Sequence, residues 1–138
     1  MYGDSNKPYT YSNITMFPNQ WSPTLLKIKQ DIEAISNQKF TSVLLNLYRD
    51  GKDSNGWHSD DEKELGTDPF IASLSFGGRR IFHFRHKKDS NQKFKIELKP
   101  GSLLLMGGKT QAFWKHQIPK TKRVVAPRIN LTFRYIKD

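Results

Sequence analysis

Residues 128–134 read Arg-Ile-Asn-Leu-Thr-Phe-Arg. Apolar and polar residues alternate along this stretch with the two-residue period of a β-strand. One face is apolar, and the opposite face would align Arg128, Asn130, Thr132 and Arg134. A strand with one side in water has this pattern. Two guanidinium groups on one face are, however, also well suited to gripping a carboxylate bidentately.

Short strands separated by turns are expected over most of the chain around this stretch. Ser22 and Pro23 supply a cap and a first-turn proline, and helical spacing of apolar residues then predicts an amphipathic helix over 23–36. After the helix, glycine and proline mark the turns. The expected strands are 40–48, 70–76, 80–86, 94–98, 102–106, 112–118 and 128–136. The pattern predicts a mainly β fold, a β-sandwich or jelly roll with the helix packed outside.

Length and composition favour one folded domain over residues 1–138. A chain of 138 residues with 36% hydrophobic residues can bury a core but is short for two ordinary domains. No apolar run is long enough to cross a bilayer, and no secretory leader opens the chain, so an intracellular location is expected, cytoplasmic or, in a eukaryote, nuclear. Cysteine is absent, so any metal must be held by histidine and carboxylate side chains.

The charge is strongly polarised along the chain. Residues 1–78 carry 7 Lys and Arg against 10 Asp and Glu, a balance of −3, whereas residues 79–138 carry 16 against 3, a balance of +13. This bias favours a polyanionic partner, and nucleic acid in particular.

A cation site is indicated between 46 and 62, where acidic residues gather around one histidine. His58 and Asp60 stand two apart, so an imidazole and a carboxylate can reach the same ion near a strand end. A distant third ligand would complete the two-histidine, one-carboxylate triad of non-haem Fe(II) oxygenases. His116, which stands 56 residues after Asp60, is one candidate for the third ligand, and His83 and His86 are rival donors. The latter two lie on opposite faces of one expected strand, so they cannot chelate together without a bulge.

Several segments together resemble AlkB-type Fe(II)/2-oxoglutarate dioxygenases, closest to the animal-type DNA and RNA repair demethylases. The matching segments are NLYRDG (46–51), WHSDDE (57–62), IASLSFG (71–77), the histidine at 116 and PRINLTFR (127–134). The run R-x-N-x-T-x-R is the most specific of them and is complete here. The resemblance covers nearly the whole chain from about Tyr9 and implies a double-stranded β-helix.

The resemblance also implies the cofactors and their ligands. Iron would be bound by His58, Asp60 and His116, with O2 as the oxidant. The cosubstrate 2-oxoglutarate would be held by Asn46, Tyr48, Arg128, Asn130 and Arg134. One of the two arginines would grip its distal carboxylate, and the sequence leaves open which one.

Substrate contacts are implied at the N-terminus and after the metal motif. Residues 1–21 would form part of a substrate-recognition lid that begins earlier in the family, so the lid is either cut short or naturally shorter here. The motif YTYS (9–12) resembles the last part of that lid, which makes Tyr9 and Tyr11 candidate substrate contacts; packing beneath an N-terminal arm fits them equally well. Glu62 matches the family's substrate-recognising carboxylate.

The activity implied is oxidative demethylation of bases such as 1-methyladenine and 3-methylcytosine in single-stranded DNA or RNA, by a monomer that releases formaldehyde. Basic residues in or near loops could hold the phosphate backbone, namely Lys87, Lys88, Lys93, Lys95, Lys115, Lys120, Lys122 and Arg123. Two alternatives stay open: a 2-oxoglutarate-dependent hydroxylase acting on protein or lipid, and a non-catalytic nucleic-acid-binding jelly roll. The basic half of the chain disfavours the first, and the intact triad disfavours the second.

Overall fold

The computed structural model describes residues 1–11 and 13–137; Ser12, the last residue of the lid motif, and Asp138 lie outside the described residues. The elements in chain order are β1 (Tyr2–Gly3), β2 (Tyr9–Tyr11), β3 (Ile14–Met16), α1 (Pro23–Ser36), β4 (Ser42–Tyr48), β5 (Asn55–His58), the 3-10 turn η1 (Lys63–Leu65), β6 (Ile71–Gly77), β7 (Arg80–His86), β8 (Lys93–Leu98), β9 (Leu103–Met106), α2 (Thr110–Phe113), β10 (Trp114–Ile118) and β11 (Arg128–Arg134).

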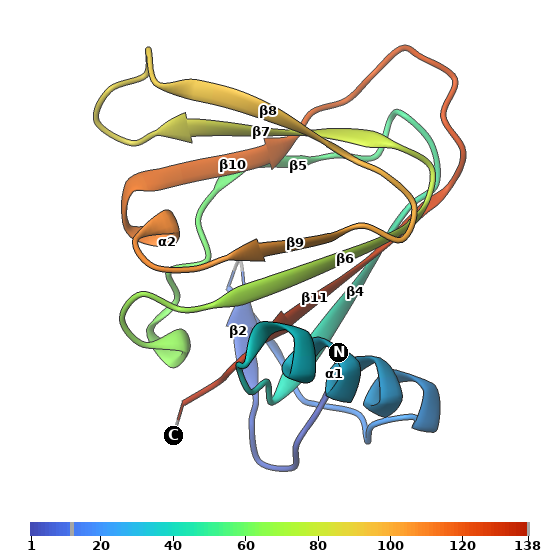
Figure 1. Ribbon diagram of the computed structural model, residues 1–138, viewed down its shortest axis with the longest axis vertical. Coiled ribbons are helices and arrows are strands. Elements are labelled where there is room, and N and C mark those ends of the chain that lie inside the picture. Colours follow the sequence, from blue (N-terminus) through green and yellow to red (C-terminus); the bar gives the residue numbers. More distant parts are fainter. Residues whose placement is uncertain (12, 138) are drawn as a thin grey trace.

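Two antiparallel sheets face each other and form the jelly roll that the sequence predicts. The larger sheet has the strand order β1-β4-β11-β6-β9, and the smaller has the order β5-β10-β7-β8. Figure 1 shows them as two layers, with the smaller sheet above and β9, β6, β11 and β4 below. One apolar core lies between the layers, with Phe82, Phe84 and Leu98 from the smaller sheet and Ile71 and Met106 from the larger. Polar side chains of β11 lie in the same interior.

Helix α1 packs against the outer face of the five-stranded sheet. Its start follows from a local cap, because the Ser22 hydroxyl accepts a hydrogen bond from the Leu25 amide at 3.1 Å and Pro23 occupies the first turn. The helix ends at Ser36 and is capped by Asn37, which has a left-handed φ of 55°. Leu25 and Ile32 pack with a second core cluster that includes Phe133 of β11. Leu131 and Phe133 on the apolar face of β11 are thereby buried, and the polar face of the strand is turned to the interior.

The structure corrects three details of the expected secondary structure. No strand is expected before the helix, but this N-terminal stretch contains β1, which pairs with β4, and a β2–β3 hairpin. No strand is expected at 55–58 either, but this polar stretch is strand β5, because it pairs along β10. The expected strand 112–118 begins with the short helix α2 and becomes a strand only at Trp114. Pairing with a neighbouring strand overrides weak local propensity in the first two cases.

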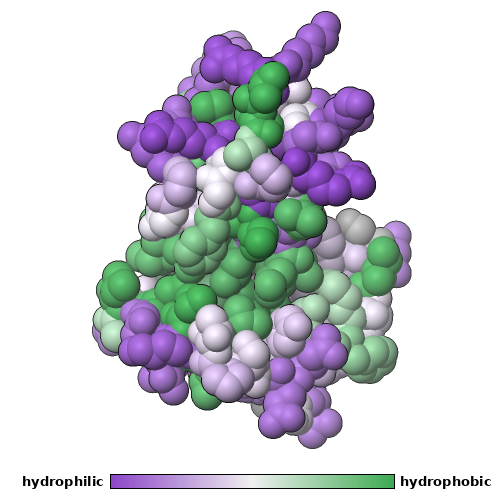
Figure 2. All heavy atoms as spheres, turned by 90° about the vertical axis from the view of Figure 1, so that its right-hand side faces the viewer, coloured by the Kyte–Doolittle hydropathy of each residue, from purple (hydrophilic) through white to green (hydrophobic). Residues whose placement is uncertain are grey.

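The outer face of the five-stranded sheet is apolar and partly open beyond the helix. Leu45, Leu47, Phe76 and Ile129 of this sheet remain exposed. Figure 2 shows a broad hydrophobic area in the middle of the side that lies at right in Figure 1, with polar side chains above and below it. Among the described residues, no helix has the length and apolar character that crossing a membrane requires.

Candidate metal centre and adjoining pocket

His58, Asp60 and His116 meet at one end of the interior. Strand pairing places His58 of β5 directly opposite His116 of β10, with their ring centroids 4.2 Å apart. One donor atom from each of the three side chains lies within 4.8 Å of the others. Two imidazoles and one carboxylate are the donor set of non-haem Fe(II) sites, which leaves positions open for cosubstrate and oxygen. The residues therefore fit an iron ion.

Each imidazole is oriented so that one nitrogen stays available. His58 uses Nδ1 in a 2.7 Å hydrogen bond with the Gly56 carbonyl, which leaves Nε2 free for a metal. His116 is buried against the Phe82 ring, and its Nδ1 makes no hydrogen bond with any described residue. Burial, with His58 adding to it, lowers the pKa of His116 from 6.5 to about 4. The ring is neutral near pH 7, and the neutral form is the one that binds metal.

Gln111 fixes the backbone at Asp60. The amide of Asp60 donates a 2.8 Å hydrogen bond to Oε1 of Gln111, a buried residue of α2. Gln111 Nε2 in turn lies 3.7 Å from the Met106 sulfur. Sequence reasoning missed Gln111, since a glutamine 51 residues from Asp60 carries no motif of its own.

Arg134 forms a buried ion pair with Asp60. One of its terminal nitrogens donates to Asp60 Oδ1 at 3.1 Å, and both side chains are almost fully buried. Burial would raise the pKa of Asp60, but the charges of Arg134, His116 and His58 outweigh burial and hold that pKa below its ordinary value. Asp60 is therefore an anion near pH 7, and Oδ1 is already occupied by the arginine.

Arg128 lies at the other end of β11 and, unlike Arg134, pairs with no carboxylate of the described residues. Its Nη2 donates to Ser75 Oγ at 3.0 Å, whereas its Nε and Nη1 are buried and make no hydrogen bond with the described residues. The guanidinium sits 4.9 Å from the Tyr48 ring. Burial lowers the pKa of Arg128, and Tyr48 opposes that effect. Unpartnered donors on a buried cation indicate a position for an anion.

Asn130 and Asn46 lie between the two arginines, directly opposite each other on β11 and β4. Asn130 is held by its own sheet, because its Nδ2 donates to Ser73 Oγ at 2.8 Å and its Oδ1 accepts from Thr132 at 2.7 Å. These residues line one cavity together with the metal triad, Tyr48 and both arginines. Ser73 and Ser75 were also missed from the sequence, although their two-residue spacing in β6 places them on the cavity side.

The two candidate lid tyrosines occupy different positions. Tyr9 is fully buried, and its ring lies 5.1 Å from the Arg134 guanidinium, so it packs behind the metal centre. Tyr11 is half-buried, lines the cavity and presents its ring to the edge of His58 at 6.1 Å. The geometry favours packing for Tyr9 and leaves substrate contact as the prediction for Tyr11.

Glu62 lies beside the cavity, near Tyr9, and is not part of its lining. The residue is half-buried, and its Oε2 has no hydrogen-bond partner among the described residues. Burial raises the pKa of Glu62, and the nearby Asp60 carboxylate raises it further. A partly dry carboxylate with a free oxygen could attract a cationic group.

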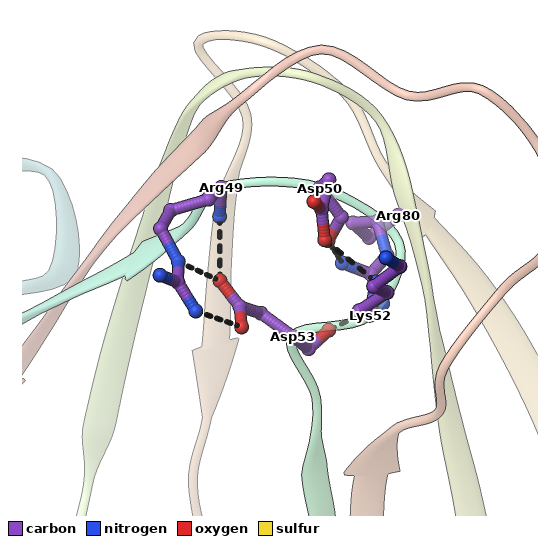
Figure 3. Close-up of polar contacts among 5 residues, drawn as sticks. All are labelled: Arg49, Asp50, Lys52, Asp53 and Arg80. Atoms are coloured by element: carbon purple, nitrogen blue, oxygen red, sulfur yellow. Dashed lines mark hydrogen bonds and ion pairs between the residues drawn. The ribbon is translucent and has the colours of Figure 1, made fainter.

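The remaining acidic residues of the 46–62 stretch make contacts within the loop or at the surface and lie outside the candidate metal site. Asp53 accepts hydrogen bonds from the Arg49 amide and guanidinium, and Asp50 accepts one from the Lys52 amide (Figure 3). Arg80 of β7 donates to the carbonyls of Asp50 and Asp53, which ties this loop to the smaller sheet. Asp61 is exposed and lies 3.7 Å from Lys87.

The rival histidines lie away from the triad. His83 lines a groove on the outer side of the smaller sheet. His86 stacks on Phe113 and accepts hydrogen bonds from the amides of Lys88 and Asp89. His116 is accordingly the histidine that the fold brings to His58 and Asp60; its role as a metal ligand remains a prediction.

Comparison with known proteins agrees with this geometry. Residues 2–134 match the 2OG-Fe(II) oxygenase superfamily. The chain belongs to that superfamily. A solved structure of OsALKBH1 superposes with a TM-score of 0.67 at 22% identity, covering 86% of this chain and 66% of that chain. This likeness supports the jelly-roll fold.

Within the superfamily the chain is of the AlkB type. It is 51% identical over 138 residues to alpha-ketoglutarate-dependent dioxygenase alkB homolog 3 of Bos taurus, an alignment that covers 94% of this chain and 48% of that protein. It is 45% identical over 143 residues to DNA oxidative demethylase ALKBH2 of Homo sapiens, covering 98% of this chain and 54% of that protein. The chain thus spans about half the length of the curated relatives it matches.

Proposed function

We propose that this chain is the catalytic domain of an Fe(II)/2-oxoglutarate-dependent dioxygenase that demethylates N-alkylated bases. Its substrates would be bases such as 1-methyladenine and 3-methylcytosine in single-stranded DNA or RNA. One observation carries the proposal: the His58, Asp60 and His116 donors share a cavity with a buried arginine, Arg128, that has unpartnered N–H groups.

Three side chains would hold the iron. His58 would bind through Nε2, because Nδ1 is hydrogen-bonded to a carbonyl. Asp60 would bind through Oδ2, because Oδ1 accepts from Arg134. When bound, Fe(II) with 2-oxoglutarate and O2 supplies the oxidation of a methyl group on a ring nitrogen, which then leaves as formaldehyde. The protein's part is to bind, orient and exclude water.

Arg128 is the better candidate for the distal carboxylate of 2-oxoglutarate. Arg134 is already paired with Asp60, whereas Arg128 lies six residues away along β11 and pairs with no carboxylate of the described residues. The unpartnered Nε and Nη1 of Arg128 offer two donors to a carboxylate. Tyr48 would complete the clamp, since its ring already faces the guanidinium. Asn46 and Asn130 would line the chain of the cosubstrate between the two ends.

The base would enter from the side of the β2–β3 hairpin. Tyr11 offers an aromatic face beside His58, and a flipped or single-stranded base is the form that can reach it. Glu62 would favour bases that carry a positive charge from methylation. The excess of Lys and Arg in residues 79–138 supports a nucleic-acid substrate. We also propose that the protein acts as a monomer and works inside the cell, where its nucleic-acid substrates are found.

A direct assay tests this function. The protein is incubated with Fe(II), 2-oxoglutarate, ascorbate and a single strand carrying one 1-methyladenine, and formaldehyde and the repaired base are measured. The proposal requires both products in equal amounts, and their absence in samples lacking 2-oxoglutarate. Decarboxylation of 2-oxoglutarate that is stimulated by a peptide or a lipid, with no repair of the oligonucleotide, would contradict it.

A further inference from the structure

The outward side of the four-stranded sheet carries a row of basic side chains. Strand alternation turns Phe82, Phe84 and His116 to the interior, so the residues between them point outward. Arg85 of β7 is the Cα partner of Lys115 on β10 and of Lys93 on β8. Three cations therefore stand side by side across three strands. Like charges directly opposite each other destabilise a sheet, so the row is unfavourable to the fold by itself.

The acidic residues near this row are already engaged. Glu97, further along β8, pairs with Arg79 at 3.2 Å. Asp89, in the β7–β8 turn, accepts hydrogen bonds from the Asn91 amide and the Gln92 side chain. Arg85 itself makes no hydrogen bond or ion pair with any described residue. The row is thus positively charged, and its N–H groups can donate hydrogen bonds to a ligand.

An aromatic ring borders the same surface. The Arg85 guanidinium lies 4.4 Å from the centroid of the Trp57 ring, reaching across β10 to the edge strand β5. Trp57, Arg85 and Lys95 line a groove of about 700 Å³, to which His83 also contributes. A stacked arginine keeps its in-plane N–H groups directed outward, and the tryptophan offers a flat apolar face.

This outer groove is one strand away from the candidate active site. Along β5, Asn55 and His58 line the interior cavity, whereas Trp57 lines the outer groove. Because β5 is the edge strand, a polymer leaving the cavity meets the outer groove after crossing that edge.

We propose that the outer groove, formed by Trp57, His83, Arg85, Lys93 and Lys95, is a second binding surface for single-stranded nucleic acid. The lysines and Arg85 contact phosphates, and a base stacks on Trp57, which is the combination that proteins use for single strands. The inference rests on the proposed function, because the strand bound here is the flanking part of the strand whose base enters the cavity. An acidic peptide would satisfy the cations but would leave the aromatic face unused.

Binding of unmodified single strands tests the surface without any turnover. The probe is a fluorescein-labelled oligonucleotide of about 20 nucleotides, measured by anisotropy at several salt concentrations. In the double variant K93Q/K95Q we expect roughly tenfold weaker binding and a salt slope lower by about 1.4, since each lost single-strand phosphate contact removes about 0.7. The matched control is K39Q/K137Q, which removes two exposed charges elsewhere and should bind like the unmodified protein.

A stacking measurement addresses Trp57. Binding of the oligonucleotide should quench tryptophan fluorescence, and W57F should lose part of that quenching while keeping its fold by circular dichroism. Equal weakening in both lysine pairs would overturn the proposal, because it would show only a general charge effect. Displacement of the oligonucleotide by poly-glutamate at equal charge concentration, as effectively as by unlabelled oligonucleotide, would also overturn it.

Turnover separates this inference from the proposed function. A methylated trinucleotide has almost no flanking strand to bind in the outer groove, so the proposal predicts that K93Q/K95Q demethylates it at the normal kcat/KM and loses efficiency only on the long strand. A protein that demethylates neither substrate yet loses binding through K93Q/K95Q would refute the proposed function and support this surface. Unchanged kcat/KM on the long strand would refute the surface and leave the function standing.

Discussion

The two sheets contribute unlike groups to the same cavity. The four-stranded sheet supplies the histidines, and these make few hydrogen bonds: His58 has one through Nδ1, and His116 Nδ1 has none among the described residues. The five-stranded sheet supplies polar groups that are fixed by their neighbours, as when Ser73 and Thr132 hold Asn130. Asp60 joins the halves, since it follows β5 and pairs with Arg134 of β11.

This difference indicates what each half depends on. The two histidines need to lie close together, which strand pairing achieves, and burial lowers the pKa of His116 so that its ring is neutral. The polar side of β11 needs defined directions, because a carboxylate is recognised by aligned N–H groups. We therefore expect substitutions of the histidines on the four-stranded sheet to abolish metal binding. Substitutions on the polar face of β11 should instead weaken cosubstrate affinity by degrees.

The largest effect is expected for His116→Ala. Loss of one of three protein ligands opens the site, so Fe(II) binding and 2-oxoglutarate decarboxylation should both fall to background. Metal titration of the protein, followed by a decarboxylation assay, measures the two. His86→Ala is the matched control and should retain both activities, because His86 contacts Phe113 and lies away from the triad. The reverse result would mean that the triad is misassigned.

A smaller, graded effect is expected for Arg128→Lys. A point charge replaces a planar fork, so the half-saturation concentration of 2-oxoglutarate should rise roughly tenfold to a hundredfold, the value of a hydrogen bond to a charged group. Metal affinity should stay normal. Arg134→Lys sharpens the comparison, because its contact with Asp60 predicts a loss in both metal and 2-oxoglutarate affinity. Identical profiles for the two variants would contradict the division between the arginines.

Gln111→Met tests the support behind the metal. Methionine keeps the volume but removes the oxygen that accepts from the Asp60 amide, so Asp60 loses its fixed position. We expect metal affinity to weaken about tenfold, the lower end of what supporting contacts contribute. The half-saturation concentration of 2-oxoglutarate, measured at saturating metal, should be nearly unchanged. A variant with normal metal affinity would limit Gln111 to packing in α2.

The alternation of polar and apolar residues in β11 could be predicted from the sequence, and so could the face of the strand that carries the candidate cosubstrate ligands. Alternation places Arg128 and Arg134 on one face whatever the tertiary structure. It could not distinguish them, because the ion pair with Asp60 joins residues 74 apart. Strand β5 was missed for a similar reason: Asn55 and Gly56 have low strand propensity, and their pairing with β10 comes from the fold.

Supporting residues were the least predictable part of the site. Gln111 and Ser75 act through partners more than 50 residues away, and neither residue type signals a role by itself. The acidic stretch gave the opposite problem, since a gathering of carboxylates around His58 does not by itself separate a metal ligand from residues that stabilise the loop. The structure assigns Asp50 and Asp53 to the loop, which follows from contacts with Arg49 and Arg80 that spacing alone does not reveal.

The smallest effect is expected for Glu62→Gln, and it concerns which base is accepted. Methylation at N1 of adenine or N3 of cytosine makes the base cationic near neutral pH, and the half-buried Glu62 carboxylate would attract that charge. The variant should lose roughly fivefold more activity on these bases than on the neutral 3-methylthymine, about 1 kcal/mol of charge attraction. Iron binding should be intact. The comparison of kcat/KM for the two substrate types measures the effect.

The same residue gives a pH dependence whose sign follows from its surroundings. Burial, with Asp60 adding to it, raises the pKa of Glu62, so the carboxylate takes up a proton at a higher pH than an exposed glutamate does. The preference for cationic over neutral bases should therefore shrink as pH falls from neutral toward the acidic range, since the protonated side chain no longer attracts a cation. Glu62→Gln, which has no such proton to take up, should show a flat ratio over that range. A ratio that changes with pH equally in both proteins would place the titrating group elsewhere and leave Glu62 as part of the wall behind Tyr9.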